Sequence, residues 1–119
     1  AYIADSYKRS LHIVNVTNPA NPVLQQTISN VEGLGDSRGI ALFGDYAIVP
    51  FIDPPNTLTT QGLVAFDVSN PLLPIIVNSF LRSNARDGVL LSSPSSIFVS
   101  GNHAYVTNTG QYPNLATIN

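Results

Sequence analysis

One turn sequence occurs twice in this chain at a fixed distance. VTNPANPV covers residues 16–23 and VSNPLLPI covers residues 68–75, so the two Asn-Pro pairs, at 18 and 70, lie 52 residues apart. Leu11, Leu63 and Leu115 repeat the same spacing of 52 residues. A fixed period of this size indicates a repeat protein, in which each repeat is one supersecondary unit. We therefore expect the chain to fold as successive copies of one unit.

The segments between the turns have the composition of β-strands. They are short, rich in β-branched and aromatic residues, and bounded by Gly, Pro, Asn, Asp or Ser. Gly44-Asp45 and Gly101-Asn102 each join two such segments, and these residue types form tight hairpin turns. The middle repeat is expected to hold strands at residues 39–43, 46–51, 62–68 and 74–80. Four antiparallel strands in a repeat of about 40–50 residues predict an all-β chain built from β-propeller blades.

The NPxxP turn has a mechanical role in such a blade, between its third and fourth strands. Pro at the second turn position fixes φ near −65°, and the preceding Asn can hydrogen-bond the backbone. The second Pro stands at the start of the fourth strand, where a missing N–H is tolerated and discourages unwanted pairing.

Composition excludes several classes of protein. The chain is 44% hydrophobic and only 10% charged, which is too apolar for a disordered segment. A net charge of −2 gives no basis for nucleic-acid binding. No apolar run approaches the roughly 20 residues of a membrane-spanning helix. Cysteine is absent, which rules out disulfides and thiolate chemistry.

The repeated segments resemble a known family. Residues 10–29 (SLHIVNVTNPANPVLQQTIS) and 62–80 (GLVAFDVSNPLLPIIVNSF) resemble LVIVD repeats, and residues 103–108 (HAYVTN) resemble a YVTN-type propeller strand. Asn15 departs from the acid that is usual at its position, whereas Asp67 matches it. The resemblance implies a propeller of about six to eight blades, often on secreted or cell-surface proteins of microbes. It implies a scaffold and no particular activity.

We expect residues 1–119 to form part of one β-propeller domain with an incomplete ring. Residues 1–30 would supply strands 2–4 of one blade, residues 39–81 a full blade, and residues 96–119 strands 1–3 of the next. The chain opens on Ala1 without a signal peptide, so we expect a piece of a larger propeller, completed by further blades of the same protein or by an adjacent chain. The alternative is an independent small β-sandwich.

The charged residues predict where a partner would bind. In a propeller, the loops between strands 2 and 3 share one face with the connections from strand 4 to the next strand 1. Ten of the twelve charges (5 basic and 7 acidic) map to this loop face. Binding residues concentrate on long loops held by a rigid scaffold, although charges also avoid strands for reasons unrelated to binding. The candidate partner-binding residues are Asp5, Tyr7, Lys8, Arg9, Glu32, Asp36, Arg38, Asp53, Arg82, Arg86 and Asp87.

Some of these residues also have narrower interpretations. Asp36 and Arg38 are expected to form a local pair or a structural contact between blades, and the same holds for Arg86-Asp87. The oxygen ligands of Asp5, Asp53 and Asn108, near the ends of second strands, could bind Ca²⁺. No calcium-loop sequence is present, so no cofactor is predicted and Ca²⁺ is only the alternative.

The remaining chemical motifs are sparse. His12 is expected to be a partly buried structural residue, and His103 to lie beside a hairpin on the face opposite the charges. Neither has a second His at ligand spacing, and no Ser lies in a GxSxG motif, so we predict no metal site and no catalytic residue. Asn15-Val16-Thr17 matches an N-glycosylation sequon, on a strand that runs into a tight turn.

These observations favour a non-catalytic β-propeller scaffold or binding module. We expect it at the cell surface, outside the cell or in the periplasm, where its charged loop face meets a protein or glycan partner. The alternative is part of a propeller enzyme, lactonase- or dehydrogenase-like, with an active site at the central channel.

Overall fold

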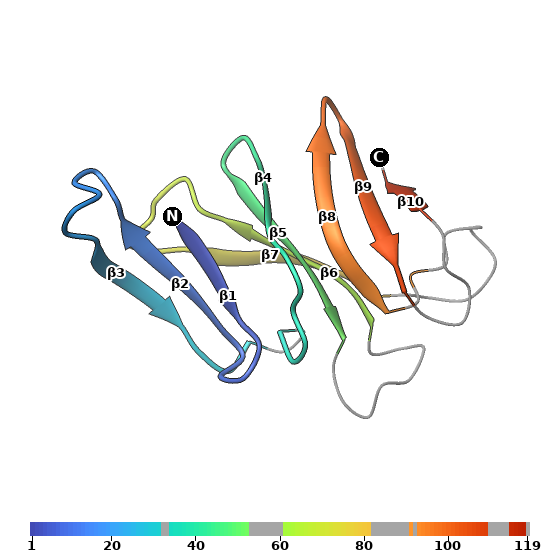
Figure 1. The fold of residues 1–119 in the computed structure, drawn as a ribbon, viewed down its shortest axis with the longest axis horizontal. Coiled ribbons are helices and arrows are strands. Elements are labelled where there is room, and N and C mark those ends of the chain that lie inside the picture. The colour runs from blue at the N-terminus through green and yellow to red at the C-terminus, as the bar shows by residue number, and fades with distance from the viewer. Residues whose placement is uncertain (32–33, 53–60, 82–90, 92, 110–114, 119) are drawn as a thin grey trace.

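The structure is a computed structural model that describes residues 1–31, 34–52, 61–81, 91, 93–109 and 115–118 (Figure 1). Within these ranges it contains strands and turns and no helix, so the predicted all-β class is confirmed. In the same ranges, no helix is long and apolar enough to cross a membrane.

The strands form three antiparallel sheets, which contain three, four and three strands (Figure 1). The first sheet holds β1 (Tyr2–Asp5), β2 (Ser10–Asn15) and β3 (Val23–Ile28). The second holds β4 (Ala41–Phe43), β5 (Tyr46–Ile52), β6 (Gln61–Asp67) and β7 (Ile75–Leu81). The third holds β8 (Pro94–Ser100), β9 (His103–Asn108) and β10 (Leu115–Ile118). Strands that follow one another in the chain are neighbours in each sheet, as in blades of a propeller.

Two glycines form the tight hairpins that the sequence predicts. Gly44 and Gly101 both have φ of 55°, and each is the first of the two residues between paired strands. A positive φ at this position is what a type II′ hairpin turn requires, and glycine adopts it without a steric penalty.

Strand β4 begins two residues later than the sequence suggests, at Ala41 rather than Gly39. The ladder runs from Phe43 opposite Tyr46 to Ala41 opposite Ile48. The next hydrogen-bonded pair would place Gly39 opposite Pro50, which has no N–H to donate. The missing donor accounts for the late start of the strand.

Two sheets carry a β-bulge at the same repeat position. In the first sheet, Gln25 of β3 is left without a partner between the residues that pair with Ile13 and Val14. In the second sheet, Val77 of β7 is left in the same way, 52 residues later (25 and 77). Strands β3 and β7 are the outer edges of their sheets. A bulge twists an edge strand and hinders its pairing with another chain.

The two NPxxP turns hydrogen-bond in the same way, as the sequence predicts. The Asn18 side chain accepts the N–H of the residue two positions on at 3.1 Å, and its carbonyl accepts the N–H three positions on at 3.0 Å. Asn70 accepts the corresponding pair of bonds at 3.0 Å each. The asparagine thus holds both turns from its side chain and its backbone.

Two apolar clusters join the three sheets face to face. The first cluster lies between the first and second sheets and includes Leu11 of β2 together with Val64 and Phe66 of β6, all fully buried. The second cluster lies between the second and third sheets and includes Leu63 of β6 and Val106 of β9. The middle sheet is therefore covered on both faces, which explains why its inner strands are almost continuously apolar.

Candidate functional site

The β1–β2 hairpin lies at one end of the first sheet and forms the first part of a charged surface (Figure 1). Asp5 Oδ1 accepts the backbone N–H of Lys8 at 3.1 Å, and the Lys8 carbonyl accepts the Ser10 hydroxyl at 3.0 Å. Arg9 has φ of 49°, a left-handed conformation that is uncommon for a residue other than glycine. These features fix the shape of the turn, and Tyr7 stands at its tip with 95% of its surface exposed.

A row of three side chains crosses the first sheet behind this hairpin. His12 Nδ1 lies 3.0 Å from Thr27 Oγ1, and His12 Nε2 lies 3.5 Å from Asp5 Oδ2. The three residues come from β2, β3 and β1, and the His12 side chain is 22% exposed, partly buried as expected. The row ties neighbouring strands together through side chains in addition to the backbone ladder.

The hairpin also sets the charge of Asp5. The backbone N–H of Lys8 lowers the pKa of Asp5 below its ordinary value of 3.8, and the hydrogen bond with His12 acts in the same direction. Hydrogen bonds to the ionised form stabilise it, so Asp5 is a carboxylate at neutral pH.

The second part of the charged surface is an ion pair in the β3–β4 connection. Arg38 Nη2 lies 2.9 Å from Asp36 Oδ2, and Arg38 Nε donates to both carboxylate oxygens at 3.2 Å. The hydrogen bond and charge of Asp36 raise the pKa of Arg38 above its ordinary value. The two side chains are 53% and 44% exposed, so this is a local, solvent-facing pair within one connection.

The two parts are joined by the backbone. The N–H of Val31 donates to the carbonyl of Arg9 at 3.0 Å, and Leu34 N donates to the Val31 carbonyl at 3.2 Å. Val31 and Leu34 are both buried in the first apolar cluster. The hairpin and the connection are thus anchored to one core, and we call this surface the charged end, defined by Asp5, Tyr7, Lys8, Arg9, Asp36 and Arg38. Asp45 and Asp67 lie at the opposite end, beside the β4–β5 hairpin and the second NPxxP turn.

Comparison with protein families agrees with the repeat geometry. The family model described as the LVIVD repeat matches residues 1–29, 34–81 and 93–112. The chain belongs to the LVIVD repeat family. The first two matched ranges of the LVIVD repeat contain β1–β3 and β4–β7, and the third contains β8 and β9. The comparison with curated proteins and the comparison with solved structures each gave no match.

Five predicted residues of this LVIVD repeat protein lie outside the described part of the chain. They are Glu32, Asp53, Arg82, Arg86 and Asp87. Among the other predicted residues, the structure brings Asp5, Lys8 and Arg9 together on one hairpin and pairs Asp36 with Arg38.

The row through His12 is the feature of the LVIVD repeat protein that the sequence analysis missed. Its signal is the cross-strand register, because His12 pairs with Ile3 on one side and with Thr27 on the other. An alignment of the three strands, rather than a motif search along one strand, would have placed His12 beside Thr27.

The charged end of the LVIVD repeat protein offers donors and acceptors of both signs on a fixed backbone. Among the described residues, no three His, Asp or Glu side chains gather as metal ligands would. Of the oxygen ligands considered for Ca²⁺, Asp5 accepts the Lys8 N–H, Asn108 is 5% exposed, and Asp53 lies outside the described residues. The chemistry that this geometry supports is recognition by hydrogen bonds and ion pairs.

Proposed function

We propose that this LVIVD repeat protein is a non-catalytic β-propeller scaffold that binds a protein or glycan partner through its charged end. The proposal places it at the cell surface, outside the cell or in the periplasm. The single observation that carries the proposal is the separation of charge: the described side chains of Lys and Arg all belong to the hairpin or to the β3–β4 connection.

The hairpin has the physical character of a recognition element. Tyr7 projects a large amphipathic ring from a turn whose backbone is held by Asp5, so little conformational entropy is lost when a partner packs against it. Lys8 and Arg9 flank the ring with hydrogen-bond donors for carboxylate, sulfate or hydroxyl groups. Tyrosine and arginine are the residue types that most often dominate binding surfaces.

We also propose that the three sheets are consecutive blades of one propeller, of about six to eight blades, with β9 as a YVTN-type strand. The identical bulges at Gln25 and Val77 and the face-to-face packing of the sheets support this arrangement. Ile3 and Phe98, on the outer faces of the first and third sheets, are 51% and 67% exposed. Further blades of the same protein, or an adjacent chain, would cover such apolar side chains.

Site-specific photo-crosslinking tests the binding proposal. A photo-reactive phenylalanine in place of Tyr7 should give covalent adducts with a partner protein or glycan on the intact protein in its native setting. The matched control is the same substitution at Leu73, which is 65% exposed in the opposite turn. Lys8→Glu should reduce the adducts formed at position 7. Adducts at position 73 alone, or equal yields with and without Lys8→Glu, would contradict the proposal.

A further inference from the structure

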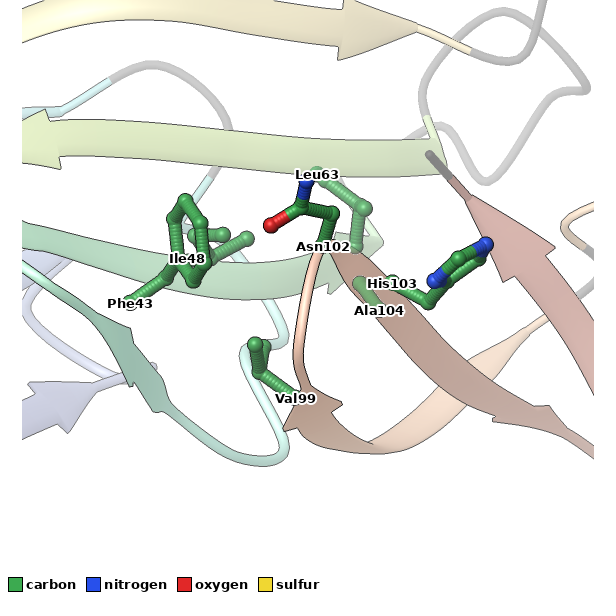
Figure 2. A pocket seen from close by; sticks show the side chains of 7 residues that line it. All are labelled: Phe43, Ile48, Leu63, Val99, Asn102, His103 and Ala104. Atoms are coloured by element: carbon green, nitrogen blue, oxygen red, sulfur yellow. The ribbon is translucent and has the colours of Figure 1, made fainter.

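A pocket opens between the second and third sheets, at the end opposite the charged end (Figure 2). Its volume is about 160 Å³. One wall comes from β4, β5 and β6, and the other comes from β8, β9 and the turn between them. The lining includes Phe43, Ile48, Leu63, Val99, Asn102 and Ala104. Both walls belong to described strands, so the pocket is complete within this chain.

The volume and lining of the pocket define the size of its occupant. Leu63 is 6% exposed at the base, and Ile48 packs against the same apolar cluster. An apolar cavity of roughly 150 Å³ lined by Leu, Ile and Phe stays dry and binds benzene. A pocket of about 160 Å³ with comparable walls therefore accommodates one six-membered aromatic ring.

The repeat itself indicates which ring chemistry suits this position. Tyr2 pairs with Ile13, and Ile48 pairs with Ala65; Ile13 and Ala65 are 52 residues apart (13 and 65), and each directly precedes the bulge of its sheet. Tyr2 and Ile48 are thus equivalent. Tyr2 packs against the cluster between the first and second sheets. Where one seam between sheets holds a phenol side chain, the next seam holds the shorter Ile48 and a pocket.

The mouth of the pocket supplies a polar group. Asn102 is exposed in the turn between β8 and β9, and in Figure 2 its amide extends toward the side on which Phe43 and Ile48 lie. Within the described part of the chain, no side chain or backbone group hydrogen-bonds to this amide. Small-molecule sites typically combine apolar walls with a few polar groups that fix orientation.

We propose that this pocket is a binding site for a small monocyclic phenol. The ring lies between the walls formed by Ile48 and Phe43 on one side and by Val99 and Ala104 on the other. The hydroxyl group bonds the Asn102 amide at the mouth. The site is separate from the charged end and does not depend on the function proposed for that end.

The test uses p-cresol, which is the free equivalent of a tyrosine side chain, in an NMR titration of backbone amides. We expect saturable shifts confined to β4–β6, β8, β9 and the turns at the pocket. Ile48→Tyr, which copies the other seam, should weaken binding at least about tenfold because the new ring occupies the pocket. Val77→Tyr is the matched control, since Val77 is 49% exposed on β7 and lines no part of this pocket.

A second pair of measurements separates the ring from the hydroxyl group. Ala104→Leu fills the opposite wall, and it decides the matter if Ile48→Tyr does not fold. Asn102→Ala should weaken binding of p-cresol to the level of toluene and leave toluene binding unchanged. The proposal is wrong if p-cresol gives no saturable shifts, if both filling variants still bind it, or if Asn102→Ala leaves its binding unchanged.

Discussion

Asn15 and Asp67 hold the same position in successive repeats, and each accepts the backbone N–H of the residue two positions further on. The distance from the side-chain oxygen to that nitrogen is 2.9 Å in both repeats, to Thr17 in one and to Ser69 in the other. An amide oxygen and a carboxylate oxygen serve equally as the acceptor of such a turn. The departure from the family pattern at Asn15 therefore leaves the turn intact and changes only its charge.

This difference in charge predicts a difference in acid sensitivity. The hydrogen bonds from Ser69 lower the pKa of Asp67 below its ordinary value of 3.8. A carboxyl group with a lowered folded pKa contributes stability that is present above the unfolded value and lost as pH falls through the folded value. Asp67→Asn should remove this part of the acid-induced loss, and Asn15→Asp should add a similar part. Urea unfolding between about pH 7 and pH 2 measures both changes; identical pH profiles for the two variants and the parent would contradict the prediction.

The hairpin glycine Gly44 predicts a purely conformational cost. Its φ is 55°, and a Cβ added there would meet nothing within 4 Å. Gly44→Ala should therefore lower the free energy of unfolding by about 1–2 kcal/mol through backbone strain alone. Gly44→Asn should lose less, because asparagine tolerates the left-handed region. Thermal or urea unfolding checks the order of the three proteins, and an alanine variant as stable as the parent would show that the turn has rearranged.

Two phenylalanines of opposite exposure test the placement of the core. Phe66 is fully buried in the first apolar cluster, whereas Phe98 is 67% exposed on β8. Phe66→Ala should lower the free energy of unfolding by about 3–5 kcal/mol, which is a large part of the stability of a small domain. Phe98→Ala should change it by no more than about 0.5 kcal/mol. Equal losses in the two variants would mean that the packing of the sheets is different from that described.

The hydrogen bond between His12 and Thr27 predicts a measurable coupling across β2 and β3. Thr27→Val keeps the shape of the side chain and removes its hydroxyl group, so the free energy of unfolding should fall by about 1 kcal/mol. In the background of His12→Val the same change should cost clearly less, because the partner is already missing. A double-mutant cycle measures this coupling, and a cost for Thr27→Val that is independent of His12 would show that the bond contributes nothing.

The sequence predicted the strands well because the repeat, the tight turns and the β-branched segments all act locally. It failed where one strand constrains another. The start of β4 depends on the missing N–H of Pro50 across the ladder, and the bulge at Gln25 becomes visible only when β3 is paired with β2.

The candidate site follows the same division. The hairpin with Asp5 and Lys8 could be located by counting strands along the chain, since it is local. The row through His12 and the pocket beside Ile48 could not, because both depend on which residues of neighbouring strands or sheets come together.

The matching bulges have a consequence for how such a chain can be lengthened or shuffled. Because Gln25 and Val77 interrupt their ladders at equivalent points, the inward and outward alternation of side chains is in phase from one repeat to the next. A duplication or recombination that joins any two positions 52 residues apart would preserve that phase. A gene encoding this protein can therefore gain or lose whole repeats without turning a buried face toward water, and the same rule permits chimeras built from its repeats.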